Sequence, residues 1–442
     1  MITMKGKYSE AKIMIDDVET ECLSQIQYFL NHEAFTNPIA IMPDTHQGKG
    51  SVIGFTMPMT EKVVPNVVGV DIGCSMLSFN IGKTLPMDLE HFDHKIRHRV
   101  PFGVDVHESS SRDVFHMEKE FPWKETTKQS LKFALAYGIR FGEIPMRSPL
   151  YDMKWFVDKC EKIGGNLRRH INSVGTVGSG NHFLETGIDS SGYIWITIHT
   201  GSRNFGKRIC DYWQAKAKKN LSKSKINYKE EVERIRKEFG ESKIKEKLDE
   251  IKENNKPGID MKGCEYLEGE DAMGYLYDMI FAQMYSHVNK QHIKRIILDI
   301  LKLDPIDEIE TIHNFIDFDD FIIRKGAIRS YEGERMIIPF NMRDGILICE
   351  GKSNPEWNFS APHGAGRVLS RGRAKRELSL ETFVAQMKGI YSTSVGRDTL
   401  DEAPGAYKDS KVIEDAIGPT ATIINRIKPI HNMKDSKGVS DD

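Results

Sequence analysis

Six short segments combine a glycine-rich turn with a side chain that can bind a metal or a phosphate. They read MPDTHQGKG (42–50), GVDIGCSM (69–76), GSGNHFLE (178–185), HTGSRNFG (199–206), HNFID (313–317) and SAPHGAGRVLSR (360–371). Glycine lets the backbone approach a ligand closely and direct N–H groups at phosphate oxygens. Each segment alone is more typical of a structural residue in a turn. Their repetition predicts one site, assembled where strands end.

Five side chains in these segments could bind divalent metal: Asp71, Cys74, His182, His199 and His313. Five donors exceed the four of a tetrahedral structural site, and a thiolate can bridge two ions, so the set predicts a two-metal centre. Thiolate and imidazole ligands by themselves favour zinc. The residue types therefore leave the identity of the metal open.

His363 differs from the other histidines because small residues surround it and Arg367 follows it in HGAGR. Small neighbours admit a substrate, backbone N–H groups and the guanidinium meet phosphate oxygens, and neutral imidazole can attack phosphorus. We therefore interpret His363 as a nucleophile. The alternative is a phosphate-binding loop in which this histidine only donates a hydrogen bond.

Strands must position these segments, and short β-branched runs predict them over 38–80, 171–210 and 336–350. Within the first range, the apolar run before GVDIGC reads as a strand that ends at the aspartate and cysteine. The segments lie far apart in the sequence, so a shared site requires one compact fold.

Helices are predicted over 86–170 and 271–302 from the spacing of apolar residues. Dense mixed charge over 215–258 predicts a helical insertion on the surface, and residues 435–442 read as a disordered tail. The predicted fold class is α/β (α+β): a single large domain over 1–442 with a β-sheet core and surrounding helices.

The composition limits the cellular location and the kinds of partner that we expect for this protein. The six cysteines form no CxxC pair, so neither a disulfide framework nor a zinc ribbon is indicated. The net charge is −2, so a nucleic-acid partner would need a local basic patch. No apolar run approaches the roughly 20 residues of a membrane span, and the N-terminal residues resemble no signal peptide. We therefore expect a cytoplasmic protein without a membrane partner.

The six segments, followed by EAPGAYKD (402–409), occur in the order found in the RtcB family of RNA-splicing ligases. The chain resembles this family from about residue 40 to about residue 434. The resemblance implies an RNA ligase that uses GTP and two Mn²⁺ ions. Such an enzyme joins RNA 2′,3′-cyclic phosphate or 3′-phosphate ends to 5′-hydroxyl ends, in tRNA splicing or RNA repair. The implied partners are tRNA or rRNA fragments, and no DNA is expected.

The resemblance also implies a role for each matching residue. Cys74 would bridge two manganese ions, with Asp71 and the three histidines named above as the remaining ligands. His363 would become guanylylated, and Asp44 would orient it. Phosphate contacts are implied for Arg203, Arg367 and Arg371. Nucleotide contacts are implied for Asn181, Glu185, Asn314, His363, Gly364, Ala365, Gly366, Tyr407 and Lys434.

The chain departs from the family pattern at three places. Ser75 follows Cys74 where the family usually has glycine, and HTGSRN stands where the family has HSGSRG. The family's PGSMG loop before HGAGR, which helps hold the nucleotide, is absent, so the choice of nucleotide stays open. With the charged insertion, these departures indicate a divergent paralogue that repairs cleaved tRNA or ribosomal RNA.

Two other functions stay open. One is a metal-dependent phosphoesterase that opens RNA 2′,3′-cyclic phosphate ends without joining them. The other is an RNA-end-binding adaptor that keeps only the fold. The complete donor set and His363 argue against the adaptor, because a binding module needs no thiolate together with a nucleophilic histidine.

Overall fold

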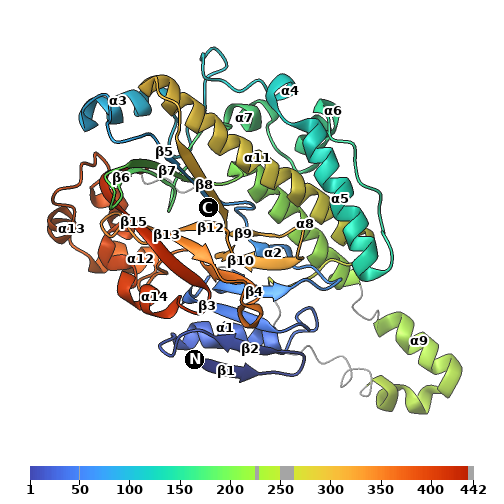
Figure 1. The fold of residues 1–442 in the computed structure, drawn as a ribbon. Helices are drawn as coiled ribbons and strands as arrows, with labels where there is room; N and C mark the ends of the chain where they lie inside the picture. Colours follow the sequence, from blue (N-terminus) through green and yellow to red (C-terminus); the bar gives the residue numbers. More distant parts are fainter. Residues whose placement is uncertain (49, 224–227, 249–262, 437–442) are drawn as a thin grey trace.

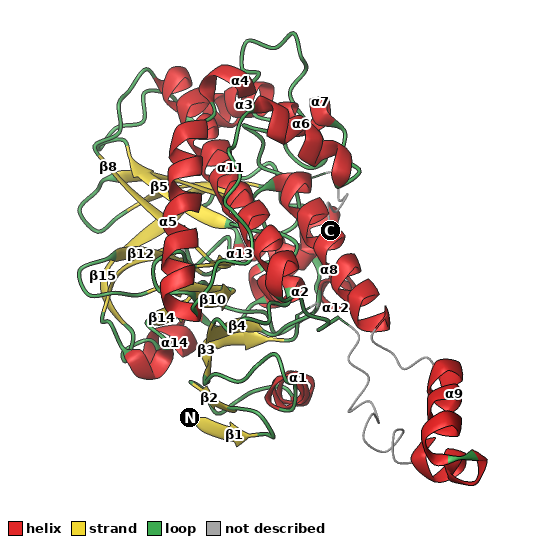
Figure 2. Cartoon of the chain, turned by 90° about the vertical axis from the view of Figure 1, so that its right-hand side faces the viewer, coloured by secondary structure: helices red, strands yellow, loops and turns green. Residues whose placement is uncertain are grey.

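The computed structural model describes residues 1–48, 50–223, 228–248 and 263–436, and its centre is formed by two large β-sheets (Figure 1). Helix α11 (Gly269–Leu301) runs beside the strands, with α5 (Trp123–Phe141) and α8 (Arg203–Lys223) packed against it. Figure 2 shows α5 on the outer side of this helical layer. The architecture confirms the predicted mixed α/β fold class.

The larger sheet has seven antiparallel strands in the order β12-β13-β15-β6-β7-β5-β8. Strand β5 (Ser75–Asn80) lies between β7 (Ile194–Thr200) and β8 (Asp307–Ile312), and Ser75 pairs with both Thr200 and Ile312. This register places the first residue of β5 beside the last residues of β7 and β8, where these strands end. The remaining strands are β12 (Arg335–Pro339), β13 (Ile346–Gly351), β15 (Ala421–Met433) and β6 (Phe183–Ile188).

The smaller sheet has six strands in the order β1-β2-β3-β4-β10-β9. They are β1 (Ile2–Lys5), β2 (Glu10–Ile13), β3 (Ile39–His46), β4 (Ile53–Pro58), β10 (Ile322–Lys325) and β9 (Asn314–Ile316). Strands β2 and β3 run parallel, and the other pairs are antiparallel. A separate pair, β11 (Ala327–Arg329) with β14 (Ser360–Pro362), leads directly to His363.

Helix α11 confirms the helix predicted over 271–302 and forms much of the core. It is buried on nearly all sides from Ala272 to Ile297, because it lies between the sheets and the outer helices. His292 is buried within it and contacts the Asp113 carbonyl oxygen at 2.7 Å, which makes it a packing residue. Among the described residues, no helix has the length and apolarity to cross a membrane.

The strand predicted immediately before Asp71 is wrong. Residues Pro65–Val68 form the short helix α2, which ends at Gly69 with φ of 97°. Proline has no N–H for a strand ladder but fits the first turn of a helix, so Pro65 favours this outcome. Asp71 and Cys74 therefore lie in the turn between α2 and β5, before a strand and not after one.

Helix α8 also changes the predicted boundaries. It begins at Arg203, inside the range predicted as strands, and continues into 215–258, where Ala217 is fully buried. Beyond it, α9 (Tyr228–Phe239) and a 3₁₀ turn (Glu241–Lys243) are helical. Residues 224–227 and 249–262 lie outside the described part, so a surface insertion over 215–258 stays a prediction. Most of the predicted tail, 437–442, is also outside it, but Asp435 is buried.

Candidate active site

A cavity of about 470 Å³ lies where the two sheets meet the loop that follows β14. Every residue that the sequence predicts for the site lines this cavity, except Asp44, which is fully buried next to His363. The lining residues are distributed along the chain from His46 to Lys434, so the fold assembles a site that no single segment contains.

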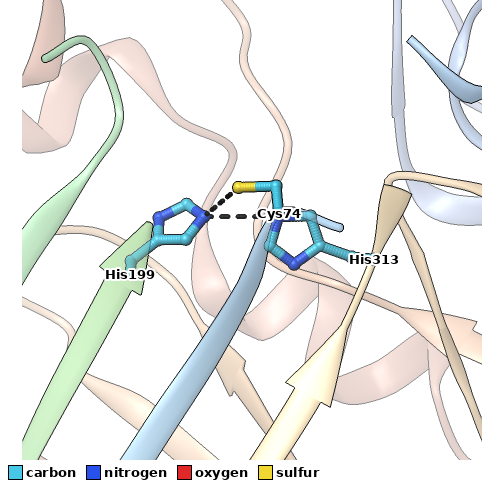
Figure 3. Close-up of side chains that lie close together, drawn as sticks. All are labelled: Cys74, His199 and His313. Carbon is cyan, nitrogen blue, oxygen red and sulfur yellow. Dashed lines mark hydrogen bonds between the residues drawn. The ribbon is translucent and has the colours of Figure 1, made fainter. Parts of the chain in front are cut away.

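The first donor set consists of Cys74, His199 and His313 (Figure 3). Cys74 Sγ lies 3.3 Å from Nε2 of His199, which lies 3.3 Å from Nε2 of His313. Cys74 directly precedes β5, His199 lies near the end of β7 and His313 directly follows β8, and Figure 3 shows the three side chains converging at the ends of these neighbouring strands. A thiolate and two imidazoles in this arrangement can hold a divalent cation.

A second donor set consists of Asp71, Cys74 and His182. Nε2 of His182 lies 2.9 Å from Oδ2 of Asp71 and 3.5 Å from Sγ of Cys74. Cys74 belongs to both sets, so its sulfur lies within reach of both groups of donors. The five predicted ligands thus lie together, and the number of ions that they hold stays a prediction.

The protonation states suit metal binding. Nδ1 of His199 lies 3.2 Å from the Asn181 carbonyl oxygen, which fixes the ring proton there and leaves a lone pair on Nε2. Burial lowers the pKa of His199 and of His313 well below the usual value, so both rings are neutral. Burial and the Asp71 carboxylate raise the pKa of the Cys74 thiol, and a bound cation would deprotonate it outright. The donor set therefore fits divalent metal.

Two glycines and Ser75 shape the turn around Cys74. A Cβ at Gly201 would lie 2.0 Å from Asp71 Oδ1, so a side chain there would displace the carboxylate. Gly73 has φ of 70°, and its carbonyl accepts hydrogen bonds from Ser75 Oγ at 3.0 Å and Ser286 Oγ at 2.6 Å. The Ser75 hydroxyl therefore stabilises the turn through its hydrogen bond to the Gly73 carbonyl.

His363 is held by Asp44, which the smaller sheet contributes through β3. Oδ2 of Asp44 lies 2.6 Å from Nδ1 of His363 and accepts the backbone N–H groups of His363 and Gly364 at 3.2 Å each. The carboxylate places the ring proton on Nδ1, so Nε2 keeps its lone pair. The His363 ring centre is 4.9 Å from that of His313, so this histidine lies beside the metal-capable side chains.

Glu402 is the centre of a second group of polar residues in the cavity wall. Its Oε2 accepts hydrogen bonds from the Tyr407 hydroxyl at 2.6 Å and from Lys434 Nζ at 2.9 Å. Its Oε1 accepts from Nη1 of Arg371 at 2.7 Å and of Arg367 at 3.2 Å. Burial would raise the pKa of Glu402, but Lys434 and the two arginines hold it well below the usual value. The charged Glu402 carboxylate thus binds four side chains for which the family resemblance implies substrate contacts: Arg367, Arg371, Tyr407 and Lys434.

Comparison with known proteins agrees with this geometry. A family model described as tRNA-splicing ligase RtcB matches residues 25–435. The chain belongs to the RtcB family. Membership makes it an RNA ligase, as expected from the order of the motifs.

Curated members of the RtcB family align over most of the chain. The RNA-splicing ligase RtcB of Escherichia coli K12 is 28% identical over 419 residues, covering 90% of each protein. The tRNA-splicing ligases RtcB of Aeropyrum pernix and Nanoarchaeum equitans are 25% and 24% identical, and they cover 96% and 97% of this chain and 92% and 94% of their own lengths. The residues matched by the family model, 25–435, include all site segments.

Arg203 and Asn314 lie at the metal end of the cavity in this RtcB-family chain. Nη1 of Arg203 lies 3.2 Å from Nδ1 of His182, and its Nε lies 3.2 Å from Thr176 Oγ1, so the guanidinium is held beside the second donor set. The Asn314 amide accepts the Gly326 N–H at 3.0 Å and donates to the Asp71 carbonyl at 3.3 Å. Both residues therefore contact members of the second donor set, Arg203 through His182 and Asn314 through the backbone of Asp71.

Glu185 is a buried acid with an incomplete set of hydrogen bonds. Asn432 donates to its Oε2 at 2.8 Å, while Oε1 has no hydrogen-bond partner in the described part of the chain. Burial raises the pKa of Glu185 to about 8, so the carboxyl is protonated at neutral pH. A neutral carboxyl in the cavity wall can both donate and accept a hydrogen bond.

Sequence reasoning missed three features of the site. Glu402 was within the EAPGAYKD segment, but a single carboxylate gave no sign that four groups converge on it. His46 lines the cavity, and burial lowers its pKa to about 4. The segment that replaces the family's PGSMG loop also forms cavity wall, through Phe340 and Met342 among others.

Proposed function

We propose that this RtcB-family ligase joins RNA 2′,3′-cyclic phosphate or 3′-phosphate ends to 5′-hydroxyl ends through a guanylylated His363, using GTP and two Mn²⁺ ions. The observation that carries the proposal is the 2.6 Å contact between Asp44 Oδ2 and His363 Nδ1, next to two donor sets that share Cys74. A histidine with a fixed tautomer beside a site for two cations suits nucleotidyl transfer.

The metal ions would be held by the two donor sets. Asp71 and His182 would bind one ion, His199 and His313 the other, and Cys74 both. Bound divalent ions would neutralise phosphate charge and orient the phosphates for in-line displacement. Manganese rather than zinc is the proposed ion, although the thiolate and imidazoles by themselves suit zinc.

The first step forms the covalent enzyme. Nε2 of His363 attacks the α-phosphorus of GTP, a nitrogen–phosphorus bond forms, and the bond to the pyrophosphate oxygen breaks. The ring gains positive charge in this step, and the Asp44 carboxylate stabilises that charge through Nδ1.

The later steps transfer the nucleotide to RNA. Water first opens a cyclic phosphate to a 3′-phosphate. An oxygen of that phosphate attacks the phosphorus on His363, which frees Nε2 and leaves GMP on the RNA end. The 5′-hydroxyl oxygen of the second RNA then attacks the 3′-phosphorus, the hydroxyl proton passes to solvent, and GMP departs. The proposed natural substrates are cleaved tRNA or rRNA fragments.

The Glu402 cluster gives the nucleotide its proposed place. Tyr407 and Lys434 would contact guanosine, together with the neutral carboxyl of Glu185. Arg367 and Arg371 would contact phosphate oxygens, which can compete with Glu402 for the guanidinium groups because both are anionic acceptors.

The test is formation of a covalent adduct. Purified protein with Mn²⁺ and each of the four α-labelled nucleoside triphosphates should retain label after denaturation, with GTP the most effective. His363→Ala should abolish the label, and His91→Ala, which changes an exposed histidine on α3 (Leu89–Arg99), should not. No adduct with any nucleotide would refute the proposal. Opening of cyclic phosphate without a joined product would indicate the phosphoesterase instead.

A further inference from the structure

Lys408 is a buried cation at the junction of three segments that build the active site. It is 9% exposed and does not line the cavity, so its ammonium group is not placed to contact a substrate. Its Nζ donates to the Thr45 carbonyl at 2.7 Å and lies 3.5 Å from the Pro43 carbonyl oxygen. These two carbonyls flank Asp44, so the cation holds the strand on both sides of the carboxylate that contacts His363.

Strand β3 is irregular where Lys408 contacts it. Its pairing with β4 passes from Ile41 opposite Phe55 to His46 opposite Ile53, so residues 42–45 have no partners in the register of these two described strands. A buried carbonyl without a donor costs about as much free energy as a lost hydrogen bond, and a bulged strand bends locally. Lys408 supplies a donor to this bulge from a distant segment of the chain.

The loop that carries His363 packs directly on the same bulge. Gly366 has φ of 74°, and a Cβ on it would lie 2.2 Å from the Asp44 carbonyl oxygen, so the two backbones are in contact. The backbone N–H of Lys408 donates to the Gly366 carbonyl at 3.0 Å. Lys408 therefore binds the loop through its main chain and the strand through its side chain.

Neighbouring contacts fix the position of Lys408 itself. Tyr407, the preceding residue, donates its hydroxyl to Glu402 at 2.6 Å. On the other side, Asp409 caps α14 (Ser410–Ala416), a short helix that contacts β3 (Figure 1). The Lys408 side chain therefore extends from a backbone that is held at both ends, and it connects this end of the cavity to β3.

We propose that Lys408 is a positioning residue for the transfer of the nucleotide to His363, a role that rests on the function proposed above. By holding β3 against the loop, Lys408 keeps Asp44 Oδ2 at the 2.6 Å contact with His363 Nδ1. Without Lys408 the bulge can relax away from the loop, and the ring loses the partner that orients it. A shift of about 1 Å can cost on the order of 100-fold in rate, so a residue outside the cavity can control the reaction.

Single-turnover transfer of label from α-labelled GTP tests this role. Lys408→Met keeps the length of the side chain and removes its donors, so the maximal rate should fall by about 10- to 100-fold. The GTP concentration at half-maximal rate should stay within about twofold of wild type, because Lys408 forms no part of the cavity wall. Lys411→Met, at an exposed lysine of α14, should change neither quantity. A wild-type rate in Lys408→Met, or weaker GTP binding as its only defect, would overturn the proposal.

Proton NMR reports the contact between His363 and Asp44 without any reaction. The proton of a short charge-assisted hydrogen bond resonates far downfield, and His363→Ala identifies the signal by removing it. The signal should be lost in Lys408→Met and kept in Lys411→Met, whereas an unchanged signal in Lys408→Met would overturn the proposal. A wild-type chain that forms no adduct would refute the proposed function, and the NMR result would then decide alone whether Lys408 positions His363.

Lys408→Arg takes the place of Lys408→Met if the methionine variant does not fold. Arginine keeps the positive charge, but its planar head group cannot occupy the position of the ammonium group beside the Thr45 carbonyl. This variant, with folding verified by thermal unfolding, should therefore transfer label more slowly than wild type and shift the NMR signal. A wild-type rate together with an unshifted signal would overturn the proposal.

Discussion

Replacing Asp44 by asparagine would separate two roles of this carboxylate, orienting His363 and stabilising its charge. Oδ2 faces three N–H donors, namely Nδ1 of His363 and the backbone N–H groups of His363 and Gly364. The asparagine oxygen must occupy that position, because an NH₂ group there would face three donors. Asp44→Asn should therefore keep the ring tautomer and lose only the negative charge.

The expected rate follows from that loss. A hydrogen bond to a charged group is worth about 1.5–3 kcal/mol and a neutral one about 1, so the change costs roughly 1–2 kcal/mol as the ring becomes charged. At 1.36 kcal/mol per tenfold, guanylylation should slow by about 5- to 30-fold. Asp44→Ala, which also frees the ring, should slow it by more than ~100-fold.

The assay is single-turnover transfer of label from α-labelled GTP to the protein, with thermal unfolding to verify folding. An Asp44→Asn rate within about twofold of wild type would show that the charge has no role, against the expectation for a charge-assisted contact. A rate as low as that of Asp44→Ala would show that the amide does not preserve the ring position. Either result refutes the reasoning.

Four further outcomes are expected. Cys74→Ser should weaken binding of both Mn²⁺ equivalents by more than ~10-fold in titration calorimetry, whereas equal affinity would argue against a bridging sulfur. Ser75→Gly should cost about 1–2 kcal/mol in urea unfolding, through one lost hydrogen bond and a more flexible strand, while metal content after dialysis stays unchanged. Glu402→Gln should destabilise the fold by about 3 kcal/mol in the same unfolding assay, because it leaves buried cations without their carboxylate, and a change below about 1 would contradict the cluster. Burial raises the pKa of Glu185 from 4.5 to about 8. The protonated carboxyl therefore contributes fully to the free energy of unfolding below pH 4.5, and this contribution is lost as the pH rises toward 8. Urea unfolding at several pH values should show the wild type losing up to about 1.4 kcal/mol per pH unit relative to Glu185→Gln.

The sequence predicted the components of the site better than the elements that carry them. Residue types alone singled out Asp71 and Cys74, and the family order added Asp44 and Tyr407, because ligand chemistry depends on few side chains. The strand expected before Asp71 failed because apolar β-branched residues around Pro65 resemble a strand locally. Only the packed structure shows that the proline starts a helical turn.

Contacts between residues that lie far apart in the sequence could not be predicted either, because local patterns do not record them. β15 contains Pro429, which argues against a central strand, and the structure accommodates it at a register shift between Pro429 and His431. Glu402 accepts hydrogen bonds from Arg367 and from Lys434, which directly follows β15. No local sequence pattern predicts these contacts. Such features depend on pairings between distant segments.

The position of β15 has a consequence for biosynthesis. This strand follows all the others in the sequence yet lies in the middle of the seven-stranded sheet, between β13 and β6. A nascent chain that has not yet emerged past residue 421 would hold two half-sheets with unpaired edges, which can pair with other chains. Lys434 joins the cavity only when this strand inserts. The cavity wall can therefore be completed only after residue 434 has left the ribosome, and chaperones are expected to shield the open edges until then.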